Sequence, residues 1–186
     1  MKKNVHLAMV PVFGVALLLG SSLAASPGHG YVSFSPAAFA PAYGGFTDYG
    51  ASEASLSHLS TDPMVYLAPL NLPQGATVTK LTLYYNDGLE PGDATLNLWR
   101  NTPGTGHVTM ANVSTSGYAG YTYFWSDEII DYAVIDNSQY TYSLWWDVPG
   151  NVGADTIELL GVFIEYSYST SLPAVLRNFS SGLRGR

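Results

Sequence analysis

The 186-residue sequence contains no cysteine. A disulfide framework is therefore excluded, and so are a thiol nucleophile and a cysteine-ligated zinc site. Charge is also scarce, because charged residues make up 11% of the chain against roughly one quarter in typical soluble domains. After residue 25, five basic residues stand against 14 acidic ones, which gives a net charge near −9. This balance disfavours nucleic acid as a partner, since phosphate binding needs clustered Lys and Arg.

Catalytic signatures are missing as well. There is no G-x-S-x-G nucleophile elbow, and the histidines after residue 25 (His29, His58 and His107) stand far apart in the sequence, with no zinc-ligand spacing. Paired carboxylates of the glycosidase kind remain an option, with Glu165 as the sharpest candidate because it lies in an apolar run. Solvent exposure, or an ion pair with Lys80 or Arg100, explains Glu165 more simply. We therefore predict that the protein is not an enzyme.

The first 25 residues have the pattern of a secretory signal peptide. Two lysines near the start precede an apolar run that reaches residue 20, and a small-x-small cleavage site follows. The apolar run is short for a membrane span. We expect a secreted, extracellular protein with no membrane span after cleavage, consisting of a signal peptide at 1–25, one domain at 26–169 and a flexible basic tail at 170–186.

The chain after the signal lacks helical periodicity. Short runs of β-branched and aromatic residues are instead separated by Gly, Pro, Asn and Asp, which is typical of strands. The runs predict strands at residues 31–35, 64–70, 77–85, 94–100, 108–113, 121–125, 140–147 and 156–168, with a weaker one at 55–60. Eight or nine such strands predict an all-β fold, a two-sheet antiparallel sandwich of jelly-roll type, with an up-and-down barrel as the alternative. Long loops are expected at 37–50 and 126–138, where a rigid β scaffold often carries its function.

Three segments resemble a recurring set of secreted bacterial proteins. They are LPQGATVTKLTLYYND (72–87), VIDNSQYTYSLWW (134–146) and LLGVFIEY (159–166). They match the patterns LP-x-GATV…YY-x-D, DN-x-x-Y-x-Y-x-L-x-W and GV-x-I-x-Y of proteins that look like single β-sandwich domains. The resemblance covers most of residues 31–168 and implies the same fold. It implies no activity and no catalytic residue.

Aromatic residues carry the clearest hint of function, since they make up 13% of the chain with 14 tyrosines and four tryptophans. Most aromatic stripes are core, and we expect this of two sets on shared strand faces: Tyr121, Tyr123 and Trp125, and Tyr140, Tyr142 and Trp146. Alternation places Trp99, Trp145 and Tyr84 on polar, outward faces instead, with Asn97 beside Trp99. An exposed aromatic ring on a polar face is either a ligand platform or a subunit contact. The candidate ligand-binding residues are therefore Trp99, Trp145, Tyr84 and Asn97.

A weak calcium site is predicted at the turn after residue 85. Asn86, Asp87, Glu90 and Asp93 bring three carboxylates and an amide together, and Ca²⁺ prefers several oxygen ligands at close range. The spacing is not that of an EF-hand, so an ordinary polar hairpin turn is the alternative. The acidic residues at 127–131 form a second, weaker candidate.

These observations favour a secreted, non-enzymatic β-sandwich that binds a glycan or another cell-surface or matrix component. The alternative is a structural subunit that forms homo-oligomers in an extracellular coat, matrix or appendage. A carbohydrate-active enzyme is the third option. The glycan hypothesis requires accessible Trp99 or Trp145 in a monomer, whereas the structural hypothesis requires association through the same residues.

Overall fold

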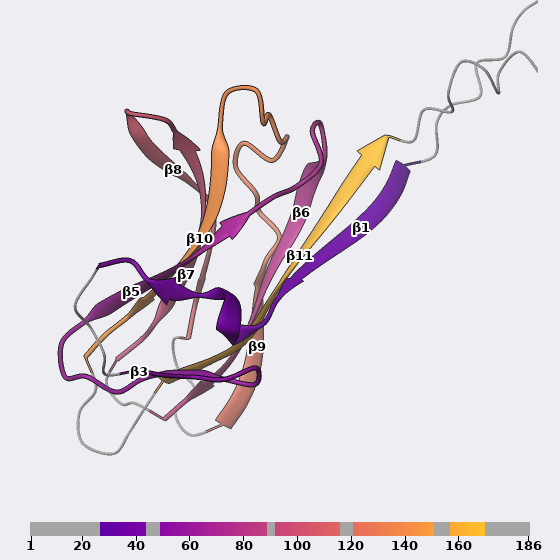
Figure 1. Cartoon of the computed structure of the whole chain (residues 1–186). Coiled ribbons are helices and arrows are strands. Elements are labelled where there is room, and N and C mark those ends of the chain that lie inside the picture. Colours follow the sequence, from indigo (N-terminus) through magenta and orange to yellow (C-terminus); the bar gives the residue numbers. More distant parts are fainter. Residues whose placement is uncertain (1–26, 44–48, 89–91, 116–120, 151–156, 170–186) are drawn as a thin grey trace, which may run out of the picture.

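A computed structural model describes residues 27–43, 49–88, 92–115, 121–150 and 157–169. These residues form two antiparallel sheets and a single turn of 3₁₀ helix, η1 (Pro36–Ala38) (Figure 1). The residues predicted as signal peptide and as basic tail lie outside the described part. Within that part, no helix is long and apolar enough to cross a membrane.

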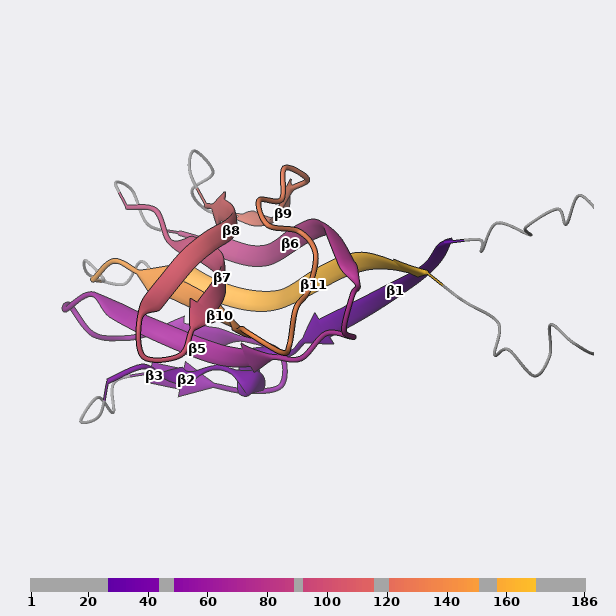
Figure 2. The ribbon, with the colours of Figure 1, turned by 90° about the horizontal axis from the view of Figure 1, so that it is seen from above.

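Sheet A contains six strands and sheet B contains five. The order in sheet A is β3 (Tyr49–Ala51), β4 (Leu56–His58), β11 (Ile157–Ser169), β6 (Thr77–Asp87) and β9 (Tyr121–Asp127), and β1 (Pro27–Phe34) also pairs with β11. The order in sheet B is β2 (Ala40–Pro41), β5 (Met64–Leu70), β10 (Thr141–Val148), β7 (Thr95–Thr102) and β8 (Gly106–Ser114). Seen from above, the two sheets lie face to face (Figure 2).

The pairing of strands β4 to β11 is that of a jelly roll. β7 pairs with β8, β6 with β9, β5 with β10 and β4 with β11, so the pairs are nested around the β7–β8 hairpin. Successive pairs alternate between the sheets, because the first and third belong to sheet B and the second and fourth to sheet A. This order is that of two Greek keys closed into a sandwich. The predicted fold class is therefore confirmed.

The core lies between the inner faces of the two sheets. Leu81, Leu83 and Tyr85 of β6 face Leu96 and Leu98 of β7, and all five are fully buried. Trp146 is among the largest buried side chains of the core. Burial of each such side chain contributes about 1.5–3 kcal/mol, which replaces the disulfides that the chain lacks.

Every predicted strand is present, and most boundaries fall within two or three residues of the prediction. Two short strands were missed, β2 and β3, both inside or at the end of the predicted loop at 37–50. Their sequences, Ala-Pro and Tyr-Gly-Ala, are too short to show alternation. They are strands only because β5 and β4 offer hydrogen-bonding edges beside them.

Three predicted orientations were wrong, each for a tertiary reason. Alternation in residues 77–85 predicts an outward Val78 on the same face as Tyr84, but a register shift between β6 and β11 turns Val78 into the core. The apolar middle of β11 predicts a strand buried on both faces, but among the described residues nothing covers its outer face around Phe163, which is 42% exposed. Trp125 was expected in the core, yet it is 53% exposed because β9 is an edge strand of sheet A.

β1 and the end of β11 project together from the sandwich as a paired ribbon (Figures 1 and 2). Two tyrosines of β11 lie over glycines of β1, Tyr166 over Gly30 and Tyr168 over Gly28, so closely that a Cβ atom at either glycine would collide with the ring. The two rings lie 6.0 Å apart between centres. Aromatic cover of this kind fills the space that glycine leaves in a strand.

Candidate ligand-binding faces

Three aromatic rings form a stacked column on the outer face of sheet B. Trp99 of β7 lies in the middle, with its ring centre 3.5 Å from that of His107 on β8 and 4.2 Å from that of Trp145 on β10. The interplanar angles are 11° and 34°. Both tryptophans point outward as predicted, since their neighbours Leu98, Leu144 and Trp146 are buried. The structure therefore joins two of the predicted site residues into one unit.

The column also changes what the two tryptophans can offer a ligand. The Trp99 ring contacts both of its neighbours, since His107 is stacked on it and Trp145 lies against it at an interplanar angle of 34°. Both tryptophans are half-buried rather than fully exposed. The column therefore offers a ligand partly exposed rings, and the Trp99 ring is held in place by its two neighbours.

Amide and hydroxyl groups surround the column. The Asn112 side chain donates a 2.7 Å hydrogen bond to Oδ1 of Asn97 across β7 and β8. Ser143 Oγ accepts from Asn101 Nδ2 at 2.9 Å and from the indole nitrogen of Trp145 at 3.0 Å. These bonds fix polar groups on both sides of the rings, and they include the predicted residue Asn97.

This outer face carries little charge. The outward positions of β7 and β10 hold Thr, Asn, Ser and Trp, with Asp147 as the one charged side chain among them: Thr95, Asn97, Trp99, Asn101, Thr141, Ser143, Trp145 and Asp147. Neutral hydrogen-bonding groups next to aromatic rings suit a ligand that is itself polar and uncharged. This face therefore offers aromatic rings beside neutral hydrogen-bonding groups.

The fourth predicted residue, Tyr84, lies on the opposite side of the molecule. It belongs to the outer face of sheet A, where its ring centre is 5.5 Å from that of Phe124 and 5.2 Å from that of Phe163. Tyr84 is 38% exposed and Phe124 is 62% exposed. The structure therefore brings together Trp99, Trp145 and Asn97, and places Tyr84 in a separate aromatic cluster.

Sequence reasoning missed several residues of these two faces. His107 and Asn112 on sheet B, and Phe124 and Phe163 on sheet A, become neighbours of the predicted residues only through strand register. His107 stood in the sequence as a lone histidine beside Val108. The only available signal was the outward position of each residue on its own strand.

Two of the predicted calcium ligands point away from each other. Asn86 and Asp87 are consecutive in β6 and point to opposite faces of sheet A, with Asp87 buried and the Asn86 amide donating to Glu158. Asp93 is exposed, and Glu90 lies outside the described residues. Within the described part, no group of three or more His, Asp or Glu side chains could hold a metal ion. Calcium binding stays a prediction.

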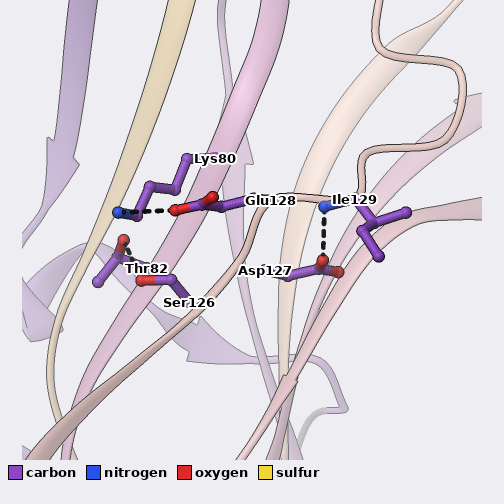
Figure 3. A network of polar contacts seen from close by, with 6 residues as sticks. All are labelled: Lys80, Thr82, Ser126, Asp127, Glu128 and Ile129. Carbon is purple, nitrogen blue, oxygen red and sulfur yellow. Dashed lines mark hydrogen bonds and ion pairs between the residues drawn. The ribbon is translucent and has the colours of Figure 1, made fainter.

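The other acidic candidates have structural partners. Asp127 accepts hydrogen bonds from the backbone N–H groups of Ile129 and of Asn112, and the second bond ties β9 of sheet A to β8 of sheet B. Glu128 forms a 3.2 Å ion pair with Lys80 (Figure 3). Glu165 is half-buried opposite Lys80 in the register of β11 and β6. Asp127 and Glu128 thus take part in contacts that hold the strands together.

His58 likewise has a structural role. Its Nδ1 lies 3.0 Å from the hydroxyl of Tyr66, and its Nε2 lies 2.7 Å from the backbone carbonyl oxygen of Asp62. Both His58 and Tyr66 are buried. Burial, followed by the nearby Tyr49, raises the pKa of Tyr66 from 10 to about 12. The Tyr66 hydroxyl therefore stays protonated in the folded protein.

No protein-family model matches the chain. No curated protein sequence matches it at a significant level. Solved structures match it at a distance. A xylan-binding module, CBM15, matches at a TM-score of 0.47 and 14% identity, over 77% of this chain and all of that one.

Two further solved structures match over a similar share of this chain. The C-terminal CBM6 module of a laminarinase from Zobellia galactanivorans matches at a TM-score of 0.45 and 12% identity, over 73% of this chain and 98% of that one. An isomalto-dextranase of Arthrobacter globiformis T6 matches at 0.43 and 12% identity, over 73% of this chain and 23% of that one. Similarities this distant assign no function to the chain.

Proposed function

We propose that the protein is a secreted, non-enzymatic β-sandwich that binds a neutral glycan on the outer face of sheet B. The observation that carries the proposal is the column of Trp145, Trp99 and His107 between two sets of fixed amide and hydroxyl groups. Sugars present apolar C–H surfaces that contact aromatic rings, while their hydroxyl groups exchange hydrogen bonds with amides. A neutral ligand also adds no charge to an acidic protein.

The rigidity of the face favours this function. The Trp99 ring is fixed by stacking, Trp145 is fixed by its bond to Ser143, and Asn97 is fixed by its bond to Asn112. A face whose side chains are already ordered loses little conformational entropy when a ligand binds. We therefore expect binding without a large rearrangement of the sheet.

The test is a binding screen of the purified chain after residue 25. Affinity electrophoresis would use gels that contain xylan, laminarin, galactan or hydroxyethyl cellulose, with and without calcium. We expect retardation by at least one polysaccharide and loss of retardation in Trp145→Ala and Trp99→Ala. Tyr43→Ala is the matched control, because Tyr43 is an exposed aromatic residue that follows β2, at the edge of sheet B opposite to β8. The calcium arm tests the predicted site at Asn86, Asp87, Glu90 and Asp93.

Absence of retardation in every gel would contradict the proposal. Equal retardation of the wild type and both tryptophan variants would also contradict the proposal, because the glycan would then bind outside the outer face of sheet B. Hydrolysis of any of the four polysaccharides would support the enzymatic alternative instead.

The second candidate function, a self-associating subunit, is favoured by strand β1. Among the described residues, β1 pairs only with β11, so one edge of this eight-residue strand has no described partner. It carries no Lys, Arg, Asp or Glu, whereas natural edge strands often carry charge to prevent pairing. Association through β1 predicts a mass that rises with concentration in sedimentation equilibrium and falls back in Tyr31→Lys.

A further inference from the structure

We infer that the outer face of sheet A is a second glycan-binding face, which makes the domain bivalent. The face is centred on Tyr84, whose ring touches Phe124 of β9 on one side and Phe163 of β11 on the other. The three rings are 38%, 62% and 42% exposed. They form a continuous aromatic band across three neighbouring strands, and an exposed apolar patch of this kind marks a binding surface.

A fixed carboxylate lies on one side of this band, displaced along the strands. Glu158 of β11 accepts a 2.7 Å hydrogen bond from the Ser57 hydroxyl of β4 and a 3.1 Å bond from the Asn86 amide of β6. Asn86 is two residues from Tyr84 on the same face of β6, a separation of about 7 Å along the strand. A carboxylate has about four acceptor positions, so Glu158 keeps capacity for the hydroxyl groups of a sugar.

Hydroxyl groups border the opposite side of the band. Thr82 Oγ1 and Ser126 Oγ lie 2.9 Å apart across β6 and β9, and the Lys80–Glu128 ion pair follows them (Figure 3). The aromatic band is therefore flanked along the strands by polar groups held in fixed positions. This order, from polar group to ring to polar group, suits a chain of sugar units laid along β6.

Charge distinguishes a glycan from a second copy of the chain as the occupant. The face carries Glu158, Glu165 and Glu128 against one cation, Lys80. A symmetric dimer through this face would bring two acidic surfaces together, and the like charges would oppose association. A neutral glycan adds no charge, and its hydroxyl groups can donate to Glu158.

The inference rests on the proposed function, because it adds a second site to the one on sheet B. The two faces lie on opposite sides of the sandwich, so one glycan molecule would be bound on each side (Figure 2). A domain with two opposed sites links separate polysaccharide chains. We therefore expect the protein to cross-link a polysaccharide solution, which a one-site module cannot do.

The experiment compares variants of each face on the same probes. Isothermal titration would use short oligosaccharides of whichever polysaccharide among xylan, laminarin, galactan and hydroxyethyl cellulose retards the wild type most. Turbidity of the full-length polysaccharide measures cross-linking. The sheet A variants are Phe124→Ala/Phe163→Ala and Glu158→Gln, and the sheet B variant is Trp145→Ala. Glu158→Gln keeps the size of the side chain, so it tests the face even where the double variant unfolds.

We expect two glycan-binding sites per wild-type chain. The double variant Phe124→Ala/Phe163→Ala and the variant Trp145→Ala should each keep one site, and neither should make the polysaccharide solution turbid. Glu158→Gln should weaken binding at the sheet A site by about tenfold, as expected for a lost hydrogen bond to a charged group. One site in the wild type, lost in Trp145→Ala and unchanged in the sheet A variants, would overturn the inference and leave the proposed function standing.

Two other outcomes would overturn one proposal or the other. One site that is lost only in the sheet A variants would overturn the proposed sheet B site. Concentration-dependent dimerisation of the wild type that Phe124→Ala/Phe163→Ala abolishes would overturn the inference in favour of a protein interface.

Discussion

The guanidinium carbon of Arg100 lies 4.0 Å from the ring centre of Tyr132. A second ring, that of Tyr140, lies 4.3 Å away, so the cation sits against two aromatic rings. Arg100 belongs to β7, and both tyrosines belong to the connection between β9 and β10. Tyr132 is also the one non-glycine residue with positive φ in the described part, at 51°. The contact therefore fastens a locally strained loop to sheet B.

Replacement of Arg100 should weaken this attachment. We expect Arg100→Ala to lower the free energy of unfolding by about 2 kcal/mol, because cation–π contacts that are partly shielded from water reach this size. Urea unfolding measures the change. Lys80→Ala is the matched control, since Lys80 forms only an exposed ion pair with Glu128 and should cost less than about 1 kcal/mol. Equal costs for the two variants would show that the rings do not stabilise the fold.

Alkaline pH should destabilise the fold through Tyr66. The pKa of the Tyr66 hydroxyl is about 12 in the folded protein, against 10 for an ordinary tyrosine, so folding favours the protonated hydroxyl. The stabilisation is complete below pH 10 and is lost as the pH rises from 10 to 12. Thermal unfolding between pH 9 and 12 (about the range of the shift) measures the loss. Tyr66→Phe should show a smaller loss over this range, and an unchanged loss would assign it to other groups.

Gly150 should tolerate no side chain. A Cβ atom there would collide with the backbone carbonyl of Thr61, which cannot rotate away as a side chain can. We expect Gly150→Ala to cost about 1–3 kcal/mol, the range for forced overpacking. Gly50→Ala is the matched control, because no atom lies within 4 Å of the Cβ position at Gly50. A melting temperature for Gly150→Ala equal to that of Gly50→Ala would contradict the close approach of the two loops.

Replacement of the consecutive residues Trp145 and Trp146 should affect different properties, glycan binding for Trp145 and stability for Trp146. Trp146 is 1% exposed in the core, so Trp146→Ala should cost about 3–5 kcal/mol of stability. Trp145 points to the outer face of sheet B, so Trp145→Ala should keep the fold and remove glycan binding there. Circular dichroism and the binding screen, applied to both variants, measure the two effects. Loss of the fold in Trp145→Ala alone would reverse the assigned orientations.

Much of the fold was predictable from local pattern. The alternation in residues 77–85 placed Leu81, Leu83 and Tyr85 in the core, and the alternation in 140–147 separated Trp145 from Trp146. A strand has a side-chain period of two, so a few residues suffice to assign its faces. The prediction failed where that period is interrupted, as at Val78, or where a strand lies at a sheet edge, as at Trp125.

The candidate sites were predictable only residue by residue. The sequence showed that Trp99, Trp145 and Tyr84 point outward, but it did not show that two of them stack while the third lies on the other sheet. The nested pairing of the strands decides which of these residues become neighbours, and local sequence pattern does not encode that pairing.

The sequence by itself determined an all-β chain without disulfides, the core face of most strands and the acidic, nearly cation-free surface. These properties follow from composition and from a period of two, which are local. Only the tertiary structure decided that His107 stacks on Trp99, that Phe124 and Phe163 flank Tyr84, and that Asn86 binds Glu158 and points away from Asp87. Each of these contacts joins strands through register, and register is set when the whole core packs.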